Sequence, residues 1–255
     1  MVKPSFVAKA TSGPRGLRGW PAVDSQYNPF CLPGSLMNFC AYCFAPSWLC
    51  EKYSFCPSAI AAHTSMAATN VTELINLAKA KPKQLIYGSG GVGNITHLEM
   101  ELLQVMTGIQ MIHVPYKGSA PSVIGLMGGE VNMIFSSVPA ALAQIKSGRM
   151  KALAVSTLQR SSALPDVPTL NESGLPGYDA ASWYGLFAPA GTPKKILAAL
   201  SGEVVKIMRV PDVRERFAGD GFEPAGQGPA EFAKFLREEI AKWARVVKTA
   251  DIKPE

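Results

Sequence analysis

The feature that most restricts the fold of this chain is a regular alternation of apolar patterns between residues 70 and 157. Short apolar runs favour buried strands, and apolar residues spaced three and four apart favour helices. The expected strands are QLIYGS, MIHVPY, VNMIFS and KALAVST, and the expected helices are NVTELINLAKAKP, ITHLEMELLQVMTG, APSVIGLMGG and PAALAQIKSG. Because strands and helices alternate, we predict an α/β fold with a parallel sheet covered by helices on both faces.

The C-terminal part has a different pattern. Residues 158–192 are rich in Pro and Gly and contain one expected strand, near residues 183–188, which is typical of a crossover or hinge. Helices are expected over Pro193–Met208 and Pro229–Thr249, since Pro is favoured in the first turn of a helix. The second of these helices carries an apolar stripe, in which we expect Trp243 to be a buried core residue.

Residues 1–66 differ from the rest in composition, because all five cysteines lie between Cys31 and Cys56. The run from Gln26 to Cys50 carries no charge, but prolines interrupt it. It therefore lacks the clean apolar stretch of about 20 residues that a membrane span needs, and it makes a poor secretory signal. We predict an irregular segment over residues 1–66 and find no recognisable signal peptide in it.

A zinc site is the alternative for the cysteine cluster. Cys40 and Cys43 have the spacing of one zinc knuckle, but Cys50 and Cys56 are too far apart to form the second tight pair that such sites use. We therefore expect no metal.

The composition also excludes classes of function. The net charge is +6, yet no run of Lys and Arg is interleaved with aromatic residues, so we expect no nucleic-acid partner. No Ser or Cys triad context surrounds His63, His97 or His113 in the sequence. We therefore expect no catalytic residues and a protein that is not an enzyme.

The segment YGSGGVGN contains the pattern G-x-G-x-x-G, beginning at Gly88, between an expected strand and an expected helix. This order is that of a dinucleotide-binding turn. A nicotinamide site also needs an acidic residue about 20 positions later, and none occurs between Glu101 and Glu130. An NADP-dependent oxidoreductase, with Lys117 near the 2′-phosphate, remains the alternative function.

The same turn can serve another anion. Glycines let the backbone approach a ligand closely, and the amides that open a helix favour a carboxylate as readily as a phosphate. Ser89, Asn94 and Thr96 place short polar side chains there. A purely structural interpretation is also open, in which Asn94 only caps the helix and the glycines only turn the chain.

Several stretches carry a resemblance to a known family. They are ELINLAKAKP, YGSGGVGNITHLEMELL, HVPYKGSAPSVIGLMGGEVNMIF, SGRMKALAVST, RSSALPDVPTLNESGLPGY, SWYGLFAPAGTP and FLREEIAKWARVVKTADIKPE. From about residue 70 onward the chain resembles the Bug-type substrate-binding receptors of tripartite tricarboxylate transporters. The resemblance implies a periplasmic-binding-protein-like (Venus flytrap) fold of two α/β lobes, with parallel-type sheets flanked by helices.

The resemblance also implies a function and a location. Such receptors bind a small carboxylate in the cleft between the lobes, without a cofactor, and work in the periplasm with membrane transporter subunits. The ligand classes implied are di- or tricarboxylates, aromatic acids and acidic amino acids.

The family's glycine loop maps onto the turn described above, and His97 is expected to orient that turn rather than bind ligand. The family often reads FDN where this chain has FSS at the end of a strand. The ligand-binding residues implied are Ser89, Gly91, Gly93, Asn94, Thr96, Ser136, Ser137 and Trp183.

The first lobe is expected to be incomplete, because the family's PFxxGGxxD and NRPGAGG stretches are missing. The predicted division is a divergent Cys-rich segment at residues 1–66, the second lobe at 67–180, and a crossover with C-terminal helices returning to the first lobe at 181–255.

Overall fold

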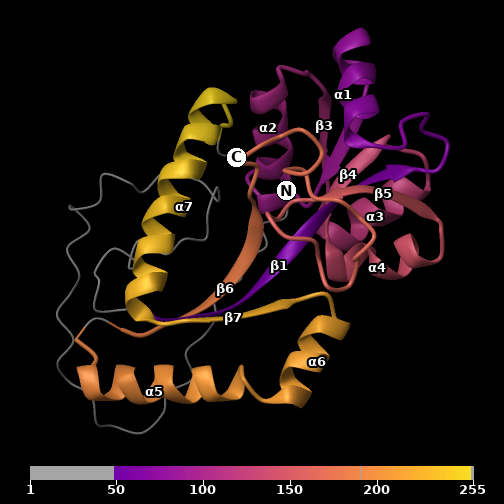
Figure 1. Ribbon diagram of the computed structural model, residues 1–255. Coiled ribbons are helices and arrows are strands. Elements are labelled where there is room, and N and C mark those ends of the chain that lie inside the picture. The colour runs from indigo at the N-terminus through magenta and orange to yellow at the C-terminus, as the bar shows by residue number, and fades with distance from the viewer. Residues whose placement is uncertain (1–48, 190, 254–255) are drawn as a thin grey trace, which may run out of the picture. The chain divides into compact units, whose positions relative to one another are not determined.

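The computed structural model describes residues 49–189 and 191–253. One long strand, β1 (Leu49–His63), takes part in two groups of strands (Figure 1). Its first half pairs antiparallel with β6 (Ala181–Phe187) and β7 (Glu223–Gln227). Its second half lies antiparallel between β4 (Met133–Ser137) and β5 (Met150–Val155). β1 therefore connects the two parts of the sheet.

The larger group of strands has the order β3-β2-β4-β1-β5. β2 (Ile86–Ser89) pairs in parallel with β3 (Ile112–Pro115) and with β4. The carboxyl ends of these three strands consequently meet at one edge of the sheet. The α/β class is confirmed, but the sheet is mixed rather than parallel throughout, because β1 runs antiparallel through its middle.

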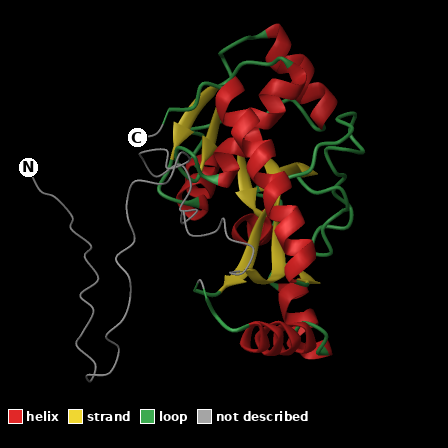
Figure 2. Ribbon diagram, turned by 90° about the vertical axis from the view of Figure 1, so that its left-hand side faces the viewer, coloured by secondary structure: helices red, strands yellow, loops and turns green. Residues whose placement is uncertain are grey.

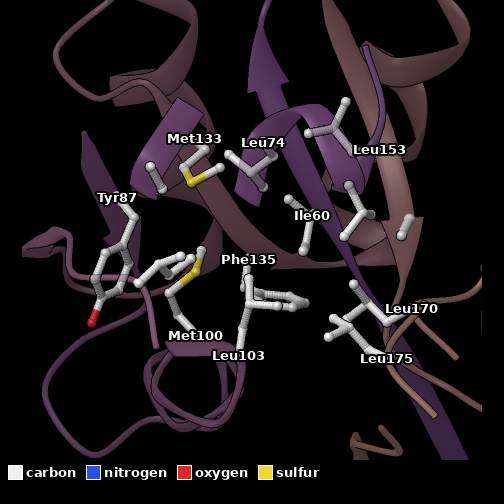
Figure 3. Close-up of a cluster of buried hydrophobic side chains, with 14 of the residues drawn as sticks. Ile60, Leu74, Tyr87, Met100, Leu103, Met133, Phe135, Leu153, Leu170 and Leu175 are labelled. Atoms are coloured by element: carbon white, nitrogen blue, oxygen red, sulfur yellow. The ribbon is translucent and has the colours of Figure 1, made fainter. Parts of the chain in front are cut away.

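Four helices cover this group of strands, one pair on each face. Figure 2 shows helices, in red, packed around the strands, in yellow. They are α1 (Val71–Ala80), α2 (Ile95–Thr107), α3 (Ser119–Met127) and α4 (Val138–Lys146). Leu74 of α1 and Leu103 of α2 pack with Ile60 and Phe135 of the sheet, as Figure 3 shows. Burial of each such side chain contributes roughly 1.5–3 kcal/mol, so this cluster fixes the helices on the sheet.

The C-terminal elements join the first half of β1. They are α5 (Lys194–Ile207), α6 (Pro211–Gly219) and α7 (Pro229–Thr249), with β6 and β7. The end of α7 also packs on α2, where Trp243 is buried in the core of the larger group and donates from Nε1 to Glu239 at 2.9 Å. The expected buried role of Trp243 is confirmed, while α6 and β7 are elements that the sequence pattern did not indicate.

The prediction of irregular structure over residues 1–66 is wrong for residues 49–63, which form β1. Four consecutive residues, Ala59–Ala62, are completely buried, because a strand with neighbours on both sides and helices on both faces has no exposed side. Cys56 and Pro57 interrupt the pattern that would have identified the strand.

The remainder of that prediction, including the zinc question at Cys40 and Cys43, lies outside the described residues. Within residues 49–189 and 191–253, no group of His, Cys, Asp and Glu could hold a metal ion. No helix in this described part is long and apolar enough to cross a membrane.

Candidate functional site

The glycine turn joins β2 to α2 at the edge of the sheet where the parallel strands end. Ser89, the last residue of β2, is completely buried. Gly91 has φ +128°, and a Cβ there would lie 3.2 Å from the carbonyl oxygen of Tyr116. Glycine is therefore required at position 91 by the backbone itself, before any ligand is considered.

The polar side chains of the turn hydrogen-bond to the turn. Asn94 Oδ1 accepts from the backbone N–H and from Oγ1 of Thr96, both at 3.1 Å. Thr96 Oγ1 in turn accepts from the N–H of Gly90 at 2.8 Å. Asn94 is thus the N-cap of α2, as one interpretation of the sequence predicted, and both side chains are engaged within the protein.

Most backbone amides of the turn also have internal acceptors. Gly91 N–H donates to Ser89 Oγ at 3.1 Å, and Gly93 N–H donates to Nδ1 of His97 at 3.1 Å. Asn94 N–H donates to the carbonyl of Gly91 at 3.1 Å. The amides of Gly93 and Asn94, which the sequence suggested as anion donors, are therefore occupied.

Two backbone amides of the turn differ from the others in their hydrogen bonding. The N–H groups of Val92 and Ile95 have no hydrogen-bond acceptor among the residues that the structure describes. Ile95 is the first residue of α2, where the helix dipole presents its positive end. These two N–H groups are the donors that remain for an anion in front of the turn.

Two stacked imidazoles lie beside the turn. The rings of His97 and His113 are 3.9 Å apart between centroids and 7° from parallel, and Tyr87 stacks on His113 at 4.8 Å. Burial lowers the pKa of His97 to about 4, and burial together with the neighbouring His97 lowers the pKa of His113 to about 3. Both rings are therefore uncharged near neutral pH. His97 accepts the bond from Gly93, so it contacts the turn that it was expected to orient.

His113 is a member of the site that sequence reasoning missed. Its Nε2 lies 2.6 Å from Oγ of Ser89, so the structure forms a Ser–His pair that the sequence did not reveal. The signal that could have found it is the parallel pairing of β2 with β3, which aligns Tyr87 with His113. Because Ser89 is completely buried, its hydroxyl is not placed as a nucleophile that a substrate can reach.

Ser136 and Ser137 end β4, the neighbour of β2 in the sheet. Ser136 is buried, and within the described part of the chain its hydroxyl makes only a long contact of 3.5 Å to the carbonyl of Ser137. Ser137 is half-buried and precedes α4. The structure therefore places both residues at the same edge as the glycine turn.

Trp183 lies elsewhere. It sits on β6 and packs edge-on against Phe232 and Phe235, with ring centroids 5.5 and 5.8 Å away. Together with Arg160 and Lys242, Trp183 lines an open cavity of about 430 Å³. No residue of the glycine turn lines this cavity. The structure thus does not bring Trp183 together with the other residues expected in the site.

A buried carboxyl group is the remaining electrostatic feature near these strands. Glu99 of α2 is completely buried, and neither of its carboxyl oxygens has a hydrogen-bond partner among the described residues. Burial raises its pKa to about 8, although the nearby hydroxyl groups of Ser58 and Ser156 and the charge of Lys242 each lower it. The sequence predicted only that Glu99 belongs to a helix and did not indicate that its carboxyl group is buried.

An α/β lobe with a glycine turn at its carboxyl edge, connected by the long strand β1 to a second group of strands, is the arrangement of two-lobed solute-binding proteins. The chain belongs to the tripartite tricarboxylate transporter family receptors, whose family model matches residues 52–252. The matched region begins earlier than the expected residue 70, because it includes most of β1.

Curated relatives agree with this assignment. The chain is 35% identical over 192 residues to the UPF0065 protein in the tcbD-tcbE intergenic region of Pseudomonas sp. strain P51, covering 75% of this chain and 57% of the relative. It is 34% identical over 197 residues to Protein BugT of Bordetella pertussis, covering 77% of this chain and 60% of that protein. The chain thus spans less than two thirds of the length of these relatives.

Solved structures are similar in fold. Rpa4515 of R. palustris with adipate has a TM-score of 0.73 and 34% identity, over 82% of this chain and 70% of that one. MatC (Rpa3494) from Rhodopseudomonas palustris with bound malate has a TM-score of 0.67 and 28% identity, over 78% of this chain and 69% of that one. The expected fold and family are confirmed.

Proposed function

We propose that this chain is a receptor that binds a small carboxylate in the periplasm and delivers it to the membrane subunits of a tripartite tricarboxylate-type transporter. The observation that carries the proposal is that the amides of Val92, in the turn, and Ile95, the first residue of α2, have no acceptor among the described residues. Adipate in Rpa4515 and malate in MatC support a dicarboxylate as the first ligand class to test.

In the proposed complex, one carboxylate of the ligand lies in front of the turn. Its oxygens accept from the N–H groups of Val92 and Ile95, and the positive end of the α2 dipole favours the charge. In this proposal Ser137, at the end of the neighbouring strand, donates a further hydrogen bond. Ser89, Asn94 and Thr96 shape the turn in this proposal and do not contact the ligand, because their polar atoms bond within it.

The strength of binding follows from the number of donors. Three charge-assisted hydrogen bonds of about 1.5–3 kcal/mol each supply roughly 5–9 kcal/mol. Association costs roughly 4–15 kcal/mol, so these bonds alone give at best weak binding, on the order of millimolar. Tighter binding requires contacts from a second lobe facing the turn.

The proposal is tested by calorimetric titration of the full 255-residue chain with adipate, malate, citrate, benzoate and glutamate. We expect at least one dicarboxylate to bind with a dissociation constant of about 10 mM or lower. No heat of binding from any of the five probes at that concentration would contradict the proposal.

The amide of Ile95 is tested by a matched pair of variants. Ile95→Pro removes the N–H while keeping the helix start, since Pro is favoured at the first helical position and Asn94 already has the extended backbone that precedes a proline. Ile95→Ala keeps the N–H and removes the partly buried side chain. We expect Pro to weaken binding about tenfold or more and Ala to weaken it little. Equal affinities for the two variants would exclude this amide as a donor.

The oxidoreductase alternative has no specific observation in its favour. The strand after the glycine turn, β3, ends at Pro115 and carries no acidic residue to hold a ribose. Lys117, the residue that would accompany a 2′-phosphate, is exposed and follows β3 in a loop.

A further inference from the structure

The turn and the two histidines beside it form one connected unit. We propose that His97 and His113 are positioning residues, which hold the glycine turn in the shape that presents its amides to the carboxylate. The inference rests on the proposed function for its ligand, but its structural part can be tested without any ligand.

Each side of Val92 is linked to a different imidazole. On one side, Gly93 N–H donates directly to Nδ1 of His97 at 3.1 Å. On the other side, Gly91 N–H donates to Ser89 Oγ at 3.1 Å, and that oxygen lies 2.6 Å from Nε2 of His113. The unoccupied amide of Val92 is therefore held between two glycine amides whose directions are set by the rings.

The two imidazole rings stack on one another and are connected to the rest of the fold. They stack at 3.9 Å, and Tyr87 continues the stack at 4.8 Å from His113. The hydroxyl of Tyr87 donates to Oε1 of Glu101 at 2.5 Å. Since Tyr87 lies on β2, His113 on β3, and His97 and Glu101 on α2, the stack joins the elements that enclose the turn.

The hydrogen bond from Gly93 determines which ring nitrogen of His97 carries the proton. Nδ1 can accept the N–H of Gly93 only when it carries no proton, so the neutral ring must carry its proton on Nε2. That nitrogen lies 3.8 Å from Oε1 of Glu101, which is too far for a hydrogen bond. The stacked neighbour, at 3.9 Å, further disfavours a positive charge on His113.

The amides and the imidazoles therefore have different roles in the site. The amides of Val92 and Ile95 bind, while the imidazoles prevent the glycines on either side of Val92 from turning away. Glycine-rich segments lose much conformational freedom on ordering, so a turn that is ordered before the ligand arrives binds more tightly. The role depends on particular nitrogen atoms as well as on ring packing, and this difference can be tested.

Two pairs of variants separate the nitrogen atoms from the rings. His97→Asn places an amide oxygen where Nδ1 lies, and His113→Gln places a polar atom near the position of Nε2, but both remove the ring. His97→Phe and His113→Phe keep a ring for stacking and remove the nitrogen. If the nitrogens position the turn, the Asn and Gln variants retain the turn and the Phe variants do not.

The first measurement is hydrogen exchange at the backbone amides of Gly91 and Gly93 in the full chain, followed by NMR. We expect His97→Phe to accelerate exchange at Gly93 about fivefold to tenfold, and His97→Asn to leave it within about twofold of wild type. His113→Phe and His113→Gln should show the same contrast at Gly91. Exchange that is fast in the Asn and Gln variants and slow in the Phe variants would overturn the inference, because packing alone would then hold the turn.

The second measurement is the affinity for adipate and malate of the same four variants. We expect the Phe variants to bind about fivefold to tenfold more weakly than wild type and the Asn and Gln variants to bind nearly as well. Wild-type protein that binds neither probe counts against the proposed function, and the exchange data then still decide the role of the rings. Phe variants that bind like wild type would overturn the positioning role.

Discussion

The clearest consequence of the structure for stability is that Glu99→Gln should remove a pH-dependent loss of stability. Glu99 is completely buried, and its carboxyl oxygens have no partner among the described residues. Burial raises its pKa from 4.5 to about 8, so near neutral pH the group is mostly protonated in the folded protein and ionised in the unfolded chain. Glutamine is close to the protonated acid in size and carries no charge.

The sign and the magnitude follow from proton linkage. Between the unfolded pKa near 4.5 and the folded pKa near 8, the folded state binds more protons than the unfolded state. The free energy of unfolding therefore falls as the pH rises through this window, by about 1.4 kcal/mol for each pH unit. From pH 5 to pH 7 this one group lowers the stability by about 3 kcal/mol, and the loss levels off above pH 8.

The assay is urea denaturation of wild type and Glu99→Gln at about pH 5, 6, 7 and 8, with Glu215→Gln as the control because Glu215 is exposed on α6. We expect the advantage of Glu99→Gln over wild type to grow with pH and to reach about 3 kcal/mol at pH 7. The control should show no such trend. A constant difference between Glu99→Gln and wild type at all four pH values would refute the reasoning.

Three further predictions concern the turn. Because the pKa values of His97 and His113 are lowered, the folded state binds fewer protons than the unfolded state below about pH 6.5, and the stability from the neutral pair is lost as the pH falls through about 4 and 3. His97→Asn should reduce this loss of stability at acid pH, measured by urea denaturation. An unchanged dependence of stability on pH would contradict the prediction. Asn94→Ala should lower the free energy of unfolding by about 1 kcal/mol, because it removes the cap on Thr96, and unaltered denaturation would show that the cap contributes nothing. Gly91→Leu should abolish carboxylate binding and also lower the melting temperature, because of its φ of +128° and the nearby carbonyl of Tyr116. Wild-type affinity in a variant with an intact fold would place the ligand elsewhere.

Local features of the fold could be predicted because they depend on residues close together in the chain. The helix α2 follows from the apolar spacing of ITHLEMELLQVMTG, and Asn94 caps it because a short polar side chain reaches an amide two residues on. The last helix, Pro229–Thr249, has the limits that its proline and apolar stripe indicate. The strand–turn–helix order around the glycines was predictable for the same reason.

The residues that determine the behaviour of the site are brought together by strand pairing and helix packing over long sequence separations. Ser89 meets His113 only because β2 and β3 pair in parallel at a particular register. Glu99 loses its contact with water only because α2 packs under α7, Tyr178 and the crossing strand β1. A sequence pattern carries the periodicity of a strand but not the identity or register of its partner.

The sequence by itself thus determined the α/β class, the family, the glycine turn and the polar residues at the ends of the strands. Only the tertiary structure decided that β1 runs antiparallel through the sheet, because strand partners are set by contacts between segments distant in sequence. The folded turn decided that the amides of Gly93 and Asn94 have acceptors three or four residues away, and that those of Val92 and Ile95 have none among the described residues. The backbone geometry of the turn, which the motif does not specify, selects the acceptor of each amide. A motif can specify which groups are present, but the folded packing decides which of them remain free to bind.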